Sequence, residues 1–152
     1  MPKASVKRLI ECKKEDLIKL VLDIEKYPEF VPFCFDAKVY ENKNEGDLTK
    51  IIADLTIGKG PFKDTYKSDV VFDKNKDAIF VKNIDGPLNH LSNNWTFTDK
   101  KNGITEITFD IDFEIKNKFL NSLMVVSFQF GLEKIADAFQ KRAEELFDSS
   151  KN

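Results

Sequence analysis

The chain has 152 residues, and its 24 basic and 26 acidic side chains leave a net charge of −2 at neutral pH. A chain of this length can bury a core without a disulfide or a structural metal, and 41% hydrophobic with 33% charged residues is typical of a globular protein rather than a disordered one. The charge balance argues against binding to a nucleic-acid backbone as the main activity, because proteins with that activity carry an excess of cations.

We expect residues 1–152 to form one domain that stays in the cytoplasm. The basic N-terminus is not followed by an apolar segment with a cleavage pattern, and no apolar run reaches 18 residues. Cys12 and Cys34 lack the close spacing of a metal-binding or redox pair. The sequence therefore predicts two free thiols, buried or half-buried, and no metal site.

The first third of the chain mixes strand and helix patterns. Residues 3–12 indicate a strand, and residues 14–26 carry Leu17, Val21 and Ile24 at the spacing of a one-faced helix. This helix must end before Pro28, since the residue before a proline avoids the helical conformation. Residues 27–34 are predicted to form one helical turn followed by an extended segment.

From residue 35 the apolar period changes from 3.6 to 2, and turn signals recur at short intervals. The predicted strands are 35–44, 48–57, 62–73, 78–84, 90–99 and 104–117. The pair Asn102-Gly103 favours a type I′ hairpin, because both residues tolerate a positive φ. Since the connections are too short for crossover helices, the sheet is predicted to be an antiparallel meander.

Alternation within the strands predicts which side chains face inward. Ile107, Phe109, Ile111 and Phe113 share one face of the last strand, and Asp110 lies on the other. Elsewhere the inward sets are Tyr66, Ser68, Val70 and Phe72; Ala53, Leu55 and Ile57; and Leu91, Trp95 and Phe97. Residues 118–149 then read as one long helix. The predicted fold is therefore α+β, a helix-grip fold with a curved antiparallel sheet of about seven strands wrapped around the C-terminal helix.

The long helix has two apolar stripes. The first, predicted to contact the core, is Phe128, Leu132, Ile135, Phe139 and Leu146. The second is Phe119, Leu123, Val126 and Phe130 on the opposite side, and it is confined to the first turns. Three alternatives stay open for the second stripe: loops cover it, it docks on a membrane or closes a pocket, or it forms a homodimer contact.

No catalytic motif is present in the sequence, and His90, the single histidine, is expected at the surface. Flat or bulky apolar side chains fall where a space between helix and sheet would be: Phe30, Phe33, Leu55, Phe62, Tyr66, Trp95, Phe109 and Phe113. They suit an apolar ligand, because each buried CH₂ contributes about 0.8 kcal/mol. They equally suit a filled core, and both interpretations stay open.

Four segments carry a resemblance: residues 27–34 (YPEFVPFC), 86–88 with 95–97 (GPL and WTF), 109–117 (FDIDFEIKN) and 139–143 (FQKRA). Through them the chain resembles, from about residue 3 to 148, the coenzyme Q-binding proteins of the polyketide cyclase/START-like superfamily. The same family includes bacterial ribosome-association toxins. Two positions depart from the pattern, since an aromatic residue often stands where this chain has Leu88 and tryptophan often stands at Phe33.

The resemblance implies a cavity that binds ubiquinone or a similar polyprenylated lipid, without a catalytic residue, a metal or a cofactor beyond the bound lipid. The residues assigned to ligand binding are Tyr27, Pro28, Phe30, Val31, Phe33, Leu55, Phe62, Tyr66, Leu88, Trp95, Phe109, Phe113 and Phe128. The second stripe would meet a membrane, such as the inner membrane, or a second subunit.

The leading hypothesis is non-enzymatic binding and delivery of the quinone in support of respiratory electron transport. One alternative is an inhibitor of ribosomal subunit association, which the acidic pI of about 5.5 disfavours. The other is a cyclase-like enzyme on the same fold, which would need a buried acid or base. DNA is not expected as a partner.

Overall fold

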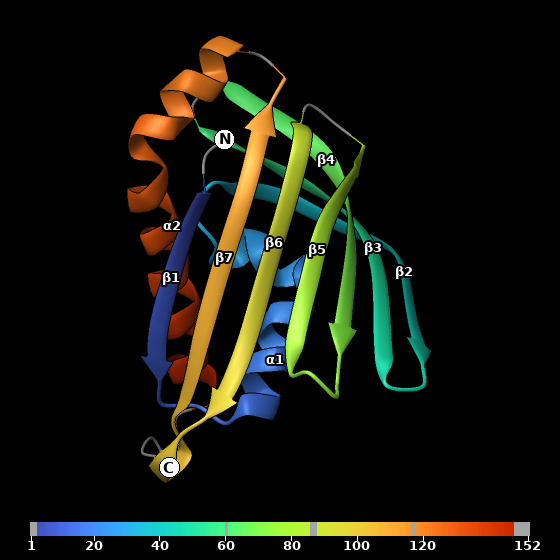
Figure 1. The fold of residues 1–152 in the computed structure, drawn as a ribbon, viewed down its shortest axis with the longest axis vertical. Helices are drawn as coiled ribbons and strands as arrows, with labels where there is room; N and C mark the ends of the chain where they lie inside the picture. The colour runs from blue at the N-terminus through green and yellow to red at the C-terminus, as the bar shows by residue number, and fades with distance from the viewer. Residues whose placement is uncertain (1–2, 60, 86–87, 117, 148–152) are drawn as a thin grey trace.

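The computed structural model describes the backbone of residues 3–59, 61–85, 88–116 and 118–147, and within these ranges all side chains except those of 59, 62, 85, 88, 89, 115 and 119–128. Figure 1 shows the order of elements that the sequence predicts. The elements are β1 (Lys3–Ile10), α1 (Lys14–Leu22), the 3₁₀ helix η1 (Ile24–Glu29), β2 (Cys34–Glu45), β3 (Leu48–Lys59), β4 (Phe62–Asp73), β5 (Ala78–Asp85), β6 (Leu88–Asp99), the short 3₁₀ helix η2 (Lys101–Gly103), β7 (Thr105–Ile115) and α2 (Lys118–Phe147).

The first helix differs from the prediction. α1 ends at Leu22, where the N–H of Asp23 bonds to the carbonyls of Lys19 and Leu20. The chain continues as η1 with Pro28 inside it. A proline fits this short helix because its fixed φ is close to that of a 3₁₀ helix. The first helix therefore does end before Pro28, as predicted, but at Leu22 instead of residue 26, and the predicted helical turn begins at Ile24 instead of Tyr27.

The sheet is antiparallel throughout, in the order β1-β7-β6-β5-β4-β3-β2, as the predicted meander requires. β1 adds to the far side of β7, with Val6 opposite Phe109. Register shifts in β2, β5 and β6 mark bulges, which bend strands and increase their twist. The result is the curved sheet of Figure 1, with α1 and α2 on its concave side.

The turn between β6 and β7 confirms the Asn102-Gly103 prediction. Asn102 has φ 63° and Gly103 has φ 73°. The N–H of Ile104 reaches the carbonyl of Lys101 at 3.4 Å, which closes the four-residue turn. Two consecutive positive φ angles define the type I′ turn that matches the twist of the flanking strands.

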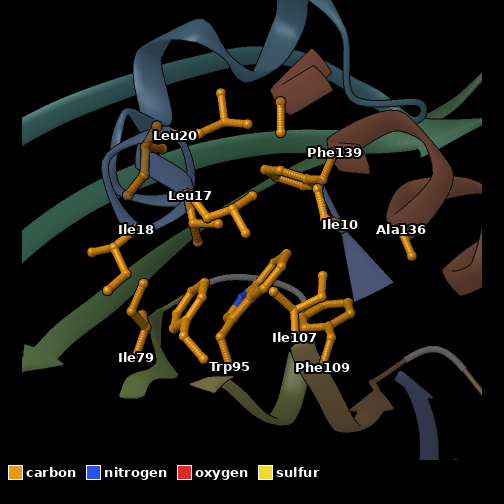
Figure 2. Close-up of a cluster of buried hydrophobic side chains, with 14 of the residues drawn as sticks. Ile10, Leu17, Ile18, Leu20, Ile79, Trp95, Ile107, Phe109, Ala136 and Phe139 are labelled. Carbon is orange, nitrogen blue, oxygen red and sulfur yellow. The ribbon is translucent and has the colours of Figure 1, made fainter. Parts of the chain in front are cut away.

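The main core lies between the sheet and the two helices. In Figure 2, Trp95 stands in the centre, between Leu17 of α1 and the side chains of β7. Its ring centroid is 4.2 Å from that of Phe109 and 5.0 Å from that of Phe139 on α2. This cluster joins α1, α2, β6 and β7.

The buried stripe of α2 is Leu132, Ala136, Phe139 and Ala143, with Ile135 half-buried beside it. The prediction for Leu146 is wrong, because this side chain is 55% exposed. The N–H of Glu11 bonds to the Glu144 carboxylate, so the helix already reaches the end of β1 at that point. Leu146 faces away from the core, whereas Phe147 beside it is half-buried and packs against the core cluster.

One strand prediction also changes at the edge of the core. Ile57 lies in the inward phase of β3 but is exposed. It stands near the end of β3, opposite Cys34 at the start of β2 and opposite exposed Asp64 on β4. The alternation of β3 is therefore as predicted, while the burial ends at Leu55.

Candidate functional site

The side chains on the concave face of the sheet are buried at one end and partly exposed further along the strands. Phe109, Trp95 and Ile79 are buried on β7, β6 and β5. The next inward residue on each of these strands is only half-buried: Ile111, Asn93 and Val81. These three are neighbours, since Asn93 pairs with Ile111 on one side and with Val81 on the other. We call them, together with half-buried Leu55, the inner band.

A second buried cluster flanks the inner band on the side away from the main core. It consists of Tyr66, Leu91 and Phe113, with Leu55 and Ile111 packed against it. Burial raises the pKa of the Tyr66 phenol, so this residue stays neutral. The inner band therefore lies between two dry apolar clusters, and its own side chains are apolar except for Asn93. Such a surface suits an apolar molecule with one polar group.

Tyr27 anchors η1 to the helices. Its hydroxyl donates to the carbonyl of Val21 at the end of α1, and its ring meets Phe139 edge-on at 5.4 Å. Burial raises the pKa of the phenol. The contacts of Tyr27 are with the protein itself, so its visible role is to hold the segment 27–34 in place. Pro28, next to it, is exposed.

Phe30 continues this aromatic contact to α2. Its ring lies 5.1 Å from Phe139, and the guanidinium of Arg142 lies 5.0 Å from its centroid. Arg142 also donates to the Glu29 carboxylate at 2.8 Å and thereby holds the pKa of that group below its usual range. η1 and α2 are thus joined by a charge pair with an aromatic ring beside it.

Phe33, between η1 and β2, contacts both β3 and α2. It has φ 69°, a left-handed conformation that a bulky residue adopts at a cost. Its carbonyl accepts from the N–H of Gly58 at 3.0 Å, which holds the strained residue against β3. Its ring atom Cε2 lies 3.7 Å from the position of a Cβ on Gly131 of α2. A side chain at residue 131 would therefore contact this ring.

The structure sorts the predicted ligand-binding residues into groups. Tyr27, Phe30, Trp95 and Phe109 pack into the main core around Phe139, whereas Tyr66 and Phe113 form the second cluster with Leu55. Val31 and Phe33 are half-buried in the connection from η1 to β2. The side chains of Phe62, Leu88 and Phe128 lie outside the described residues. The ligand-binding roles of all these predicted residues stay predictions.

The second stripe of α2 is described at one position. Phe130 is 62% exposed, and the Nζ of Lys134 lies 4.6 Å from its ring centroid. The side chains of Phe119, Leu123 and Val126 lie outside the described residues. Phe130 points away from the core, as the sequence predicts.

Sequence reasoning missed Asn93. The inward phase of β6 runs Leu91, Asn93, Trp95, Phe97, so a single polar residue interrupts an apolar series. That interruption was the available signal. A polar side chain in one inward position is as often satisfied by a backbone group as by a ligand, and only the contacts distinguish the two cases.

The outer face of the sheet carries a separate, open depression between β1, β7 and β6. Ser5 donates to the Asp110 carboxylate at 2.5 Å, and the Asp112 carboxylate lies 3.9 Å from the Lys3 amine. His90 is close by, with its Nε2 3.6 Å from Asp112. The residues around this depression are mainly polar, and it lies on the opposite side of the sheet from the inner band.

Both cysteines are free and buried, as predicted. Burial raises the pKa of Cys12 and of Cys34 to about 11, so neither thiol is a thiolate at neutral pH. Within the described residues, no group of histidine, cysteine, aspartate or glutamate side chains is arranged to hold a metal ion. In the same part of the chain, no helix combines the length and hydropathy needed to cross a bilayer.

Known proteins resemble the chain over nearly its whole length. Residues 10–140 match the sequence profile of the family described as polyketide cyclase / dehydrase and lipid transport. The ribosome association toxin RatA of Rickettsia prowazekii is 30% identical over 142 residues, 91% of this chain and 94% of that protein. The mitochondrial coenzyme Q-binding protein COQ10 of Dictyostelium discoideum is 33% identical over 135 residues, 86% of this chain but 63% of that protein.

The fold has a matching solved structure. A START superfamily protein from Mycobacterium smegmatis superposes with a TM-score of 0.80 at 19% identity, covering 95% of this chain and 98% of that one. At this identity the likeness concerns the fold alone, and it confirms the helix-grip architecture predicted from the strand order and the long helix.

Proposed function

Because the chain belongs to the polyketide cyclase / dehydrase and lipid transport family, we propose that it binds and delivers ubiquinone or a similar polyprenylated lipid, without consuming it, in support of respiratory electron transport. The observation that carries the proposal is the inner band: inward side chains of the middle strands that stay partly exposed between two dry clusters. The likeness to a coenzyme Q-binding protein supports the choice of ligand.

The chemistry of the inner band suits a carrier. An isoprenoid tail laid on Leu55, Val81 and Ile111 would gain about 0.8 kcal/mol for each CH₂ removed from water. No charged side chain belongs to the band, and the nearby phenol of Tyr66 is kept neutral by burial. Proton transfer to a substrate calls for a titratable group with a pKa tuned towards neutrality, which the band does not supply.

Ligand extraction tests the proposal directly. Purified protein is extracted with organic solvent for mass spectrometry, and ligand-free protein is mixed with liposomes that contain ubiquinone. We expect a quinone in the extract, or its transfer from the liposomes. Protein that carries no quinone and takes none up would contradict the proposal.

Two variants on adjacent residues of β5 locate the site. Val81→Trp fills the inner band, so it should reduce quinone uptake by about ten-fold or more. Lys82→Trp places the same indole on the opposite, exposed face and should bind as the wild type does. Circular dichroism confirms that both variants are folded. Equal uptake by the two would show that the quinone binds elsewhere.

A second candidate function is inhibition of ribosomal subunit association. It is favoured by one observation, the match to RatA along 94% of that protein's length. Sucrose-gradient profiles with added protein distinguish the candidates: a shift from joined ribosomes to separate subunits supports this role. If Val81→Trp keeps that shift but loses quinone uptake, the two activities use different surfaces.

A further inference from the structure

Three polar side chains stand on neighbouring strands of the concave face, and their contacts differ. The hydroxyl of Ser68 on β4 donates to the carbonyl of Ala53 at 3.2 Å. On β5 the Oδ1 of Asn83 accepts from the N–H of Leu91 at 2.9 Å. On β6 the Oδ1 of Asn93 is buried and has no hydrogen-bond partner among the residues that the structure describes. The first two residues serve the sheet, whereas Asn93 serves no visible structural purpose.

The surroundings of Asn93 make this unusual. It is the polar member of the inner band, with Val81 and Ile111 beside it in the register and Leu91 and Trp95 before and after it on the same face of β6. A buried oxygen without a partner destabilises a fold, and an apolar side chain of similar size would avoid the penalty. A group of this kind in an otherwise apolar surface fits a role in recognition.

We propose that Asn93 recognises the oxygen-bearing ring of the bound lipid, an inference that rests on the proposed function. A carboxamide carries an acceptor and a donor, so it can accept from a ring hydroxyl of the hydroquinone or donate to a ring carbonyl of the quinone. The ligand class is therefore an apolar molecule with a hydroxyl or carbonyl on its ring, and the ring lies over β6. A carboxamide serves both oxidation states, so the carrier binds quinone and hydroquinone with similar affinity.

The single tryptophan of the chain provides the measurement. Trp95 is two residues from Asn93 on the same strand face, about 7 Å along the strand. A quinone ring bound there quenches the fluorescence of Trp95. Titration with a short-tailed ubiquinone gives its affinity, and displacement by an alkylbenzene of similar size gives the affinity for an apolar ligand without ring oxygens.

The decisive variant is Asn93→Leu, and the matched control is Asn94→Leu, one residue on and on the outer face. Asn93→Leu should weaken quinone binding about ten-fold or more, the loss expected for one hydrogen bond in an apolar site, while binding of the alkylbenzene stays within about three-fold. Its Tm without ligand should equal or exceed that of the wild type. Asn94→Leu should leave both affinities unchanged.

Each of the other outcomes contradicts either the role of Asn93 or the proposed function. If Asn93→Leu binds the quinone as the wild type does, the role of Asn93 is wrong while the proposed function stands. A Tm several degrees below the wild type would make Asn93 a structural residue and would overturn the inference. If the wild type shows no quenching and no uptake of quinone from liposomes, the proposed function fails and takes this inference with it.

Discussion

Lys14 connects three parts of the fold through one amine. It opens α1, and its Nζ lies 3.0 Å from the Asp77 carboxylate and 3.2 Å from that of Asp99. Asp77 is in the turn between β4 and β5, and Asp99 is the last residue of β6. The side chain of Lys14 is 18% exposed, so solvent screens these pairs less than ordinary surface pairs. The hydrogen bond to Asp77 is the main cause of the raised pKa of Lys14.

We predict that Lys14→Met lowers the free energy of unfolding by about 1 kcal/mol near pH 7, measured by urea denaturation. A raised lysine pKa in the folded state stabilises the fold below the ordinary lysine pKa of 10.5, and this contribution is lost as the pH rises through the higher folded value. The difference between variant and wild type should therefore be constant from about pH 7 to 9 and shrink above about 10.5. Lys82→Met, on an exposed side chain, serves as the control. A difference that grows at alkaline pH would contradict this account.

Residues also show where sequence reading succeeds. Asn102 and Gly103 were predictable because a type I′ turn needs two residues that accept positive φ, a local requirement. Phe33 was not, because its left-handed conformation depends on β3 and α2, which are distant in sequence. Asn93 shows the same limit: its polarity is visible in the sequence, but its lack of a partner emerges only when the strands are placed.

At the scale of elements, Phe139 is the residue of the buried stripe of α2 that contacts three aromatic rings. The ring of Phe139 meets Tyr27 at 5.4 Å, Phe30 at 5.1 Å and Trp95 at 5.0 Å. It thereby joins α2 to both η1 and β6. The remaining buried positions of the stripe are smaller, with alanines at 136 and 143.

We predict that Phe139→Ala lowers the free energy of unfolding by about 3–5 kcal/mol, because it removes a buried ring and leaves a cavity among three aromatic neighbours. Leu146→Ala, on the same helix but at an exposed position, should change stability by less than about 0.5 kcal/mol. Chemical denaturation measures both. A large effect of Leu146→Ala would contradict the exposed position of this side chain.

Element types were more predictable than element ends. The strands follow from strict alternation and from frequent turn signals, which are properties of neighbouring residues. The early end of α1 and the exposure of Leu146 depend on how the helices pack against the sheet, which the sequence does not reveal. For the same reason the list of inward residues could not be divided into core and site: Trp95 and Ile111 share an inward phase, but Trp95 is buried in the cluster of Leu17 and Phe139, whereas Ile111 is half-buried.

At the scale of the whole molecule, the concave side is divided between two tasks. One end, closed by α1 and the second half of α2, is a packed core, while the inner band lies towards the start of β6 and the end of β7. Phe130 lies on α2 with its ring exposed and a lysine amine above it. An aromatic ring with a cation beside it suits the surface of a bilayer that contains anionic lipids.

We therefore predict that Phe130→Glu reduces co-flotation with anionic liposomes several-fold, because it replaces an apolar contact by a repelled charge. Lys134→Ala should weaken flotation less than Phe130→Glu does, and it should make flotation less sensitive to the salt concentration. Light scattering on the same samples tests the homodimer alternative, which requires Phe130→Glu to lower the molecular mass. If neither flotation nor mass changes, Phe130 serves no contact of either kind.

The pairing of β1 with β7 also sets a time order on assembly. Ser5 faces Asp110, so β1 finds its partner only after more than a hundred further residues have been added. The last helix then rests on this same strand, where Gln129 and Gln140 donate to the carbonyls of Ser5 and Leu9. A growing chain that stops short of β7 thus contains the hairpins of the middle strands, but β1 is not yet paired with β7. The strand on which α2 rests is therefore not yet part of the sheet. β1, β7 and α2, which are far apart in sequence, thus complete the molecule together.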